Sequence, residues 1–395
     1  MADRYCIWLV TLAIAAGLRP AQCRTITVGP PPGCEHAGIQ KAADQAKPGD
    51  VVLVKPGTYH GQVRLQCEGT PWAPITIRAE KRGASVLQGT HANAKKLNLA
   101  KQENGSGFFI IPGARHIVLE GFEIRGFYAD GVLIHGDSVT VRNCHIHNNG
   151  NHTLESPYGY NGVFSAGSSH DNVYEGNVIH HNGRIGRAVQ HDHGLYLCGN
   201  RAKIVNNLIY SNAGFGVHVA GYSAADGYII VNNTICFHMR GSGIALWKAK
   251  KSGSVRNCAI RNNIIAFNAW YGIDFVGDDG HVVSHNIIFG NGQLKALPGS
   301  PGYDGRWQKE LRQFGDERGW FFAYDKGCFT ASDNLNVDPR FTDPTGQDFR
   351  PRVTSVAIDR GTGDGAPQTD INGVSRPQGK GVDIGAYEAP EPPAA

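Results

Sequence analysis

The densest group of ionisable side chains lies near the middle of the chain, in the stretch Gln190-His-Asp-His-Gly-Leu-Tyr196. Histidine and tyrosine are side chains that exchange protons with a substrate, and a neighbouring carboxylate can orient an imidazole. We therefore assign His193 as a general base, Tyr196 as a general acid, and Asp192 as a member of the same catalytic group. The other interpretation of Asp192 is a side chain that caps a turn.

This set of residues suits the removal of a proton beside a carboxylate, as in β-elimination or C5 epimerisation of a uronate. Such a reaction needs a cation or hydrogen-bond donor on the carboxylate, a base for the adjacent proton, and an acid on the other side. His218 or Arg187 is expected to be that donor, and His218 joins the catalytic residues. Residues with a positive charge, a ring or a polar group near the same positions are the expected substrate-binding set: His191, Arg184, Arg187, Trp247, Lys248, Tyr271, His135 and Asn161.

Two repeating ladders of asparagine indicate how these residues are positioned. In the first ladder each asparagine has an isoleucine two places on, and the members lie 23 to 30 residues apart: Asn177, Asn207, Asn233, Asn263 and Asn286. The second runs five residues behind, through Asn149, Asn182, Asn212, Asn268 and Asn291, with His238 replacing asparagine once. A fixed motif with loops of variable length indicates stacked coils, and stacked amides can hydrogen-bond to one another.

A third register predicts one strand per coil. A glycine precedes a short alternating segment at Gly131, Gly162, Gly194, Gly216, Gly243 and Gly272. The residues one and three past each glycine are nearly all apolar and should point inward, whereas the residues two and four past it should face outward. Neighbouring strands are about 4.8 Å apart, so Tyr196 and His218 should lie side by side on one outer face.

The asparagine ladders, together with the glycines that precede the short alternating segments, resemble the right-handed parallel β-helix repeat family. This family includes pectate lyases, polygalacturonases and alginate-modifying enzymes. The resemblance covers roughly residues 116 to 292. It implies an all-β right-handed parallel β-helix, a solenoid, whose N-terminal end is closed by a helical cap. We expect this helix at His36 to Lys47, before the turn Pro48-Gly49-Asp50.

The C-terminal part resembles a segment of many secreted bacterial β-helix proteins, the choice-of-anchor-Q type. The resemblance is carried by Asp338-Pro-Arg-Phe341, Ala357-Ile-Asp-Arg-Gly361 and Asp383-Ile-Gly-Ala-Tyr-Glu388, with Val356 departing from the usual proline. The expected organisation is a signal peptide at 1–23, the cap and first coils at 24–115, central repeats at 116–292, an insertion at 293–336, the C-terminal segment at 337–389 and a tail at 390–395.

The amino-acid composition limits the fold classes and the kinds of partner that this protein can have. Gly makes up 52 of 395 residues, as expected for a chain that turns several times per coil, and only 18% of residues are charged. The net charge of +4 is too small to indicate nucleic-acid binding and only mildly favours a polyanion. The short apolar run at 7–16 predicts export to the periplasm, cell surface or medium, and no segment is long enough to span a membrane.

Export would allow disulfides, and we expect Cys34 to pair with Cys67. No cysteine spacing indicates zinc, so no metal ligands are assigned. Calcium stays open as a cofactor through Asp130, Asp192 or backbone carbonyls, although the sequence has no contiguous acidic loop of the calcium-binding kind. We expect a monomer.

The predicted function is that of a secreted protein acting on an acidic polysaccharide, as a uronate lyase or epimerase. One alternative is a glycoside hydrolase of the polygalacturonase kind, for which Ala129-Asp-Gly131 and Asp278-Asp279 supply carboxyl groups. Another is a non-catalytic scaffold that binds a glycan or a cell-envelope partner. In that case His135 and His218 would be solvated surface residues and Trp247 a packing cover. The polysaccharide and the bond are not determined by the sequence.

Overall fold

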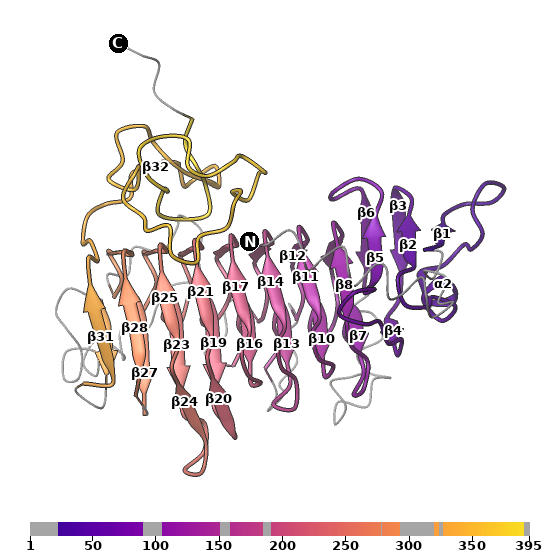
Figure 1. The fold of residues 1–395 in the computed structure, drawn as a ribbon, viewed down its shortest axis with the longest axis horizontal. Helices are drawn as coiled ribbons and strands as arrows, with labels where there is room; N and C mark the ends of the chain where they lie inside the picture. The colour runs from indigo at the N-terminus through magenta and orange to yellow at the C-terminus, as the bar shows by residue number, and fades with distance from the viewer. Residues whose placement is uncertain are drawn as a thin grey trace, which may run out of the picture.

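The chain winds as a solenoid of three parallel β-sheets (Figure 1). The computed structural model describes residues 23–89, 105–150, 159–184, 191–277, 279–292, 320–323 and 327–390. Each full coil adds one short strand to each sheet, and every pairing within the three sheets is parallel. The predicted all-β right-handed parallel β-helix is therefore confirmed.

Sheet 1 contains the strands that precede the first asparagine ladder. In spatial order it comprises β1 (Thr25–Val28), β2 (Val51–Val54), β5 (Ile75–Ala79), β8 (Ile117–Glu120), β11 (Thr140–Arg142), β14 (Val173–Glu175), β17 (Lys203–Val205), β21 (Ile229–Val231), β25 (Ala259–Arg261), β28 (His281–Ser284) and β31 (Phe329–Ser332).

Sheet 2 contains the strands that follow the first ladder. It comprises β3 (Gly57–His60), β6 (Ser85–Gln88), β9 (Glu123–Arg125), β12 (His145–His147), β15 (Val178–His180), β18 (Leu208–Tyr210), β22 (Thr234–Cys236), β26 (Ile264–Ala266) and β29 (Ile287–Phe289).

Sheet 3 contains the strands that begin after the glycines. It comprises β4 (Val63–Leu65), β7 (Phe108–Ile110), β10 (Val132–Ile134), β13 (Val163–Ser165), β16 (Leu195–Leu197), β19 (Val217–Ala220), β23 (Ile244–Trp247), β27 (Ile273–Val276) and β30 (Phe321–Ala323). A two-stranded extension, β20 (Ala224–Asp226) with β24 (Ser254–Arg256), projects from two adjacent coils.

The asparagine ladders hold the coils in register. The Asn233 side chain donates to Oδ1 of Asn263 at 2.9 Å and to the carbonyl of Ile204 at 2.8 Å, and its own Oδ1 accepts from the Asn207 side chain at 2.9 Å. The second ladder is built in the same way, and His238 accepts the Asn212 backbone N–H through Nδ1 in place of an asparagine. Both predicted ladders are confirmed.

The residue before many ladder positions has a left-handed backbone conformation, which turns the chain sharply between sheets. Asn206, Asn232 and Asn262 have φ of 58°, 55° and 54°, and asparagine adopts this conformation more readily than most residues. Glycine is required at the start of a sheet 3 strand for a different reason, which is steric. A Cβ on Gly194 would lie 2.6 Å from the Gly216 carbonyl oxygen and 2.9 Å from the Asn212 amide nitrogen, so only glycine fits.

Replacing Asn233 by alanine is expected to lower the free energy of unfolding by about 3 kcal/mol, because several buried donors and acceptors lose their partners together. The measurement is chemical denaturation followed by circular dichroism. Asn372→Ala is the matched control, because Asn372 is exposed and only its backbone is seen to hydrogen-bond. Equal losses for the two variants would contradict the structural role of the ladder.

The N-terminal end of the solenoid carries the helix α2 (Ile39–Ala43), which contacts β1, β2 and β4 and buries Ile39, Ala42 and Ala43. It is shorter than the predicted span of His36 to Lys47. His36 instead pairs with Val28 in extended conformation, and Gly38 at the N-cap provides no side-chain hydrogen bond. Among the described cysteines, Cys34 and Cys67 are free thiols, so the expected disulfide is wrong.

The C-terminal segment covers the outer face of part of sheet 2 (Figure 1). It includes the antiparallel pair β32 (Phe341–Asp343) and β33 (Asp348–Pro351). Phe349, Ile371 and Ile384 pack on the outward side chains of β18, β22, β26 and β29. The coils continue past residue 292, since β30 and β31 join sheets 3 and 1 and Asn334 extends the first ladder.

Candidate functional site

The outer face of sheet 3 brings together the residues that the sequence singled out. Tyr196 on β16 and His218 on β19 are direct cross-strand partners, with ring centroids 5.0 Å apart, as the register predicted. His193, at the bend before β16, lies behind them, and its ring centroid is 4.7 Å from that of His218. The two outward rings and the buried imidazole therefore form one group, which we call the Tyr–His centre: His193, Tyr196 and His218.

Both ring nitrogens of His193 are engaged. Its Nδ1 accepts the backbone N–H of Phe215 at 3.1 Å, and its Nε2 lies 3.1 Å from Nδ1 of His218. Since a backbone N–H can only donate, the neutral His193 ring carries its proton on Nε2 and donates it to His218. Burial, followed by the nearby His218, lowers the pKa of His193 well below its ordinary value.

This arrangement leaves His218 as a hydrogen-bond donor directed away from His193. With Nδ1 accepting from His193, the neutral His218 ring carries its proton on Nε2, and this atom has no hydrogen-bond partner among the described residues. Burial, together with the charge of His191, lowers the pKa of His218 to about 3, so the ring is neutral at physiological pH. His191 itself is exposed.

Tyr196 is the accessible member of the centre. It is half-buried, its ring stacks on Phe164 with centroids 5.3 Å apart, and its hydroxyl lies 2.8 Å from the hydroxyl of Tyr222. Burial raises the pKa of Tyr196, so the phenol stays protonated. The sequence did not single out Phe164 or Tyr222 as site residues. The register did place Phe164 on the outer face, whereas Tyr222 follows β19 in a loop whose path the repeat does not define.

Asp192 and Arg184 form a buried ion pair below the centre. Arg184 donates from Nε and from its backbone N–H to Oδ2 of Asp192, both at 2.8 Å, and a terminal nitrogen donates to Oδ1 at 2.8 Å. The Tyr160 backbone N–H also donates to Oδ1, and the two charged side chains are 2% and 0% exposed. Burial alone would lower the pKa of Arg184, but Asp192 outweighs it and the pKa is raised. Both residues therefore position the bend before His193 and do not face a substrate.

Asn161 has a similar supporting position. Its side chain donates to Oδ1 of Asp130 at 2.9 Å and accepts the backbone N–H of His193 at 2.9 Å, and it is fully buried. Burial raises the pKa of Asp130 to about 7. Both oxygens of Asp192 and Oδ1 of Asp130 already accept hydrogen bonds from the protein, so these oxygens are not free to bind the calcium ion that the sequence left open.

The remaining predicted binding residues are spread along the same wall. Trp247 is half-buried, with its ring centroid 5.2 Å from that of His218, and Lys248 follows it directly. Tyr271 is buried in a cluster with Phe215 and other rings. His135 lies at the other end, edge-on to Phe109 and Phe164. Arg187 lies outside the described residues.

One further carboxyl group belongs to the outward row. Asp274 on β27 is in register with Ala245, which is in register with His218. Burial raises the pKa of Asp274 to about 7, although the neighbouring Trp247 and Ser242 act in the opposite direction. Its side chain is only 3% exposed, so it lies under the aromatic cluster and not on an open surface.

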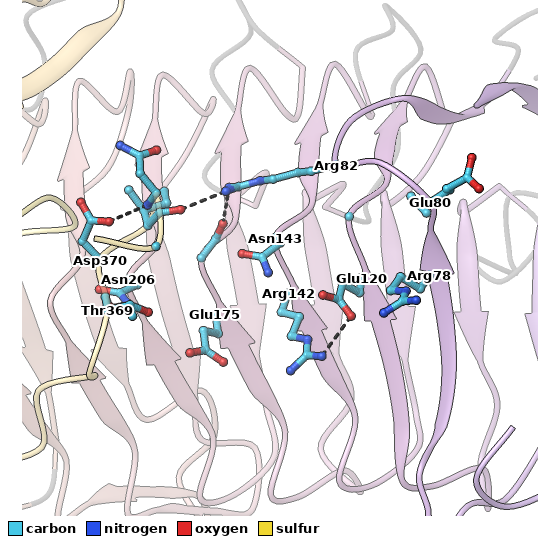
Figure 2. Close-up of a pocket in the computed structure, with 16 residues that line it drawn as sticks. Arg78, Glu80, Arg82, Glu120, Arg142, Asn143, Glu175, Asn206, Thr369 and Asp370 are labelled. Carbon is cyan, nitrogen blue, oxygen red and sulfur yellow. Dashed lines mark hydrogen bonds and ion pairs between the residues drawn. The ribbon is translucent and has the colours of Figure 1, made fainter. Parts of the chain in front are cut away.

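A hollow of about 560 Å³ lies between sheet 1 and the C-terminal segment (Figure 2). Its floor is a cross-strand row of alternating charge, Arg78, Glu120, Arg142 and Glu175, in which Arg142 and Glu120 form an ion pair at 3.0 Å. Arg82 donates to the carbonyls of Ile371 and Gly176 at 2.9 Å each and so ties the C-terminal segment to the coils. Such a balanced row of opposite charges stabilises sheet pairing.

None of the helices among the described residues combines the length and apolar character needed to cross a membrane.

Comparisons with known proteins agree with this architecture. Residues 82–252 match the family model described as right handed beta helix region. An uncharacterized protein of Bacillus subtilis (strain 168), YwoF, is 20% identical over 79% of this chain and 85% of its own length. The crystal structure of pectate lyase Pel9A superposes with a TM-score of 0.55 at 16% identity, over 93% of this chain and 97% of that one.

An alginate lyase from Paenibacillus sp. str. FPU-7 matches with a TM-score of 0.43 at 16% identity, over 80% of this chain and 99% of that chain. The match to the family model and the three stacked parallel sheets lead to one conclusion: this chain has the right-handed parallel β-helix fold, which it shares with pectate lyase Pel9A.

Proposed function

We propose that this protein acts on an acidic polysaccharide bound across the outer face of sheet 3, by β-elimination or C5 epimerisation of a uronate residue. One observation carries the proposal: Tyr196 and His218 are cross-strand partners with their functional groups on the same face, and His193 fixes His218 from behind. A protonated phenol and an imidazole N–H thus lie beside each other on a rigid sheet. This is a preorganised pair of donors for one sugar ring.

His218 is the group that stabilises the uronate carboxylate. Its Nε2–H has no partner among the described residues and is held in place by the His193 contact; this atom is buried, so a carboxylate reaches it only when the rings that cover it move aside. Negative charge develops on the carboxylate when the adjacent C5 proton leaves, so a fixed N–H donor at this point lowers the barrier. A neutral imidazole that cannot titrate near pH 7 would keep this role over the whole physiological range.

Tyr196 is the proton donor. Because burial keeps its phenol protonated, Tyr196 can protonate the leaving glycosidic oxygen in elimination, or return a proton to C5 in epimerisation. The neighbouring Tyr222 hydroxyl, 2.8 Å away, shares a hydrogen bond with this phenol and helps to orient it.

We no longer assign the role of general base to His193, as the sequence analysis did. Both nitrogens of His193 are engaged and the residue is 1% exposed, so we assign it to positioning His218. His191 takes the role of base in this proposal. It is exposed and lies two residues before His193 at the same bend, and histidine is a common general base.

The surrounding side chains support binding of a charged glycan. Phe164, Tyr222 and Trp247 offer rings that can pack on sugar faces, and the Lys250 ammonium lies 5.4 Å from the centre of the Tyr222 ring. Lysines beside these rings would attract carboxylates. Pectate lyase Pel9A is built on the same fold, so a solenoid of this kind can carry uronate chemistry. Export of the protein, through a signal peptide at 1–23, is part of the proposal.

The carboxyl groups placed on sheet 3 do not form a hydrolytic pair, and the glycoside hydrolase alternative stays untested for Asp278–Asp279. Asp130 precedes β10 and Asp274 lies on β27, and four strands separate these two in sheet 3. Five strand spacings amount to about 24 Å, whereas two hydrolytic carboxyl groups need to lie about 5 to 9 Å apart. The Asp278–Asp279 pair cannot be placed, since residue 278 lies outside the described ranges.

Incubation of the purified protein with alginate, pectate and glycosaminoglycans is the test of the reaction. A lyase will produce unsaturated uronate ends that absorb in the ultraviolet, and an epimerase will introduce deuterium at C5 in heavy water without chain cleavage. New reducing ends without ultraviolet absorbance would establish a hydrolase and overturn the proposal. Binding of a polymer without any of these products would favour the scaffold.

A further inference from the structure

A cluster of histidines lies on the outer face of sheet 2, on a different wall from the Tyr–His centre. His145 and His147 both belong to β12, and two-residue periodicity puts them on the same side of that strand. His180, on β15 in the next coil, is the cross-strand partner of His147, and His181 follows it. The motif His145-Ile-His147 and the later His180-His181 are visible in the sequence, but only the coil register brings them together.

The imidazoles are close enough to share one ligand. One ring nitrogen from each of His145, His147 and His180 can be chosen so that all three atoms lie within 4.8 Å of one another. The rings of His147 and His180 are stacked, 4.9 Å apart at 8°, and the His145 ring lies 4.2 Å from that of His147. These three side chains converge from two adjacent strands whose positions the asparagine ladders fix.

The hydrogen bonds within the cluster join the ring nitrogen of one histidine to the ring nitrogen of another. Nε2 of His145 and Nε2 of His180 are 2.6 Å apart, and Nδ1 of His180 and Nδ1 of His181 are 2.7 Å apart. Each contact requires one proton between two basic nitrogens. Nδ1 of His147 is buried and has no hydrogen-bond partner among the described residues, and the residue is 8% exposed. This unpartnered nitrogen is a second, independent sign that the cluster is built for a ligand.

The charged neighbours of the cluster include one carboxylate, which is shared with an arginine. Glu123 on β9 places Oε1 3.3 Å from Nε2 of His147, and the same oxygen is 2.8 Å from a terminal nitrogen of Arg125. A carboxylate beside a ligating histidine is the usual orienting partner at metal sites. On the other side Tyr210 stacks on His180 with ring centroids 4.6 Å apart and donates its hydroxyl to Gln347 of the C-terminal segment. The cluster is therefore walled by an acidic group and an aromatic ring.

We propose that His145, His147 and His180 bind a divalent transition-metal ion, of which Zn²⁺ is the expected one, and that this ion ties β12 to β15 beside the C-terminal segment. Three imidazoles without thiolate or a contiguous acidic loop favour zinc, copper or nickel over calcium or magnesium. Imidazole nitrogens bind zinc at about 2.0 to 2.1 Å, so two ligand atoms in tetrahedral geometry lie about 3.4 Å apart.

Binding therefore asks for a rearrangement: the rings of His147 and His180 are stacked, with their lone pairs in parallel planes, so one ring must rotate before both can face the same ion. The His145 and His180 nitrogens, now 2.6 Å apart, would have to separate by less than 1 Å, which side-chain rotation can provide. The fourth position would be taken by water or by Glu123.

Metal content of the full chain, expressed without a histidine tag, is the direct test. The protein is treated with EDTA, dialysed against ZnCl₂ and analysed by mass spectrometry, with one zinc ion per chain as the expected result. Addition of CoCl₂ should give the intense visible bands of low-coordinate, nitrogen-ligated cobalt. CaCl₂ should not displace the metal. Wild-type protein that retains no stoichiometric zinc would overturn the proposal without any variant being needed.

Variants then locate the ion. His147→Gln and His180→Gln should each weaken zinc binding at least about tenfold, while His60→Gln, at an exposed histidine on β3, should leave it unchanged. Circular dichroism establishes that each variant is folded. If one variant does not fold, the cobalt spectrum of the wild-type protein still tests the proposed site. A spectrum with only the bands of hexa-aquo cobalt would mean an adventitious ion only and would refute the proposal. Equal affinity in all four proteins would place the metal elsewhere and refute the assignment.

Discussion

Replacing Tyr196 by phenylalanine should lower turnover of the uronate polymer by about 10²- to 10⁴-fold, the usual contribution of one general acid. The change removes only the hydroxyl that we assign as proton donor. The ring still stacks on Phe164, so the fold and the Michaelis constant should change little. The measurement is steady-state formation of product on whichever polymer the wild-type protein converts.

Tyr222→Phe is the matched control for this experiment. It removes the partner hydroxyl 2.8 Å away and leaves the Tyr196 phenol in place, so the loss of turnover should stay below about tenfold. If Tyr196→Phe kept full activity, the phenol would have no part in the chemistry. If the two variants lost activity equally, the hydroxyl pair and not Tyr196 alone would be the functional unit.

Replacing Asp192 by asparagine should lower the free energy of unfolding by about 3 kcal/mol. The substitution leaves the Arg184 guanidinium, 2% exposed, without its counter-charge, and it puts an amide N–H where a carboxylate oxygen now accepts hydrogen bonds. A buried charge that loses its partner is far more costly than an exposed one. The loss should appear as a lower denaturation midpoint, with lower activity because the same bend carries His193.

The chain provides an exposed counterpart for comparison. Asp171 and Arg201 make the same two-pronged contact, with nitrogen to oxygen distances of 2.8 Å, but their side chains are 43% and 55% exposed. Asp171→Asn should cost less than about 1 kcal/mol, because solvent screens the pair. Similar losses for Asp192→Asn and Asp171→Asn would show that burial does not set the strength of the Arg184 pair.

The neighbourhood of Tyr196 and His218 could be predicted because it depends only on the coil period. The glycine starts fix which residues face outward, and the ladder spacing fixes which strands are adjacent, so the cross-strand pairing followed directly. The same regularity predicted the asparagine hydrogen bonds. It could not predict Tyr222, which lies beyond the strand in a loop.

The roles of His193, Asp192 and Arg184 depended on contacts that no repeat encodes. Nδ1 of His193 cannot accept a proton from a substrate because it accepts the backbone N–H of Phe215 from the next coil. Arg184 turns inward because Asp192 accepts three of its hydrogen bonds. In each case a polar group that is cut off from water takes the nearest available partner. The sequence shows the groups but not which partner is nearest.

The amino-acid sequence alone determined the class of fold, the phase of each coil, and the face on which Tyr196 and His218 lie, because all three follow from short periodic patterns that stacking must satisfy. Only the tertiary structure decided which ionisable side chains are buried and paired. It also placed His36 in an extended pairing with Val28 before the helix, and it brought His145, His147 and His180 together. Burial and ring orientation are set by side chains from neighbouring coils and the C-terminal segment, whose approach distances no local pattern in the chain contains.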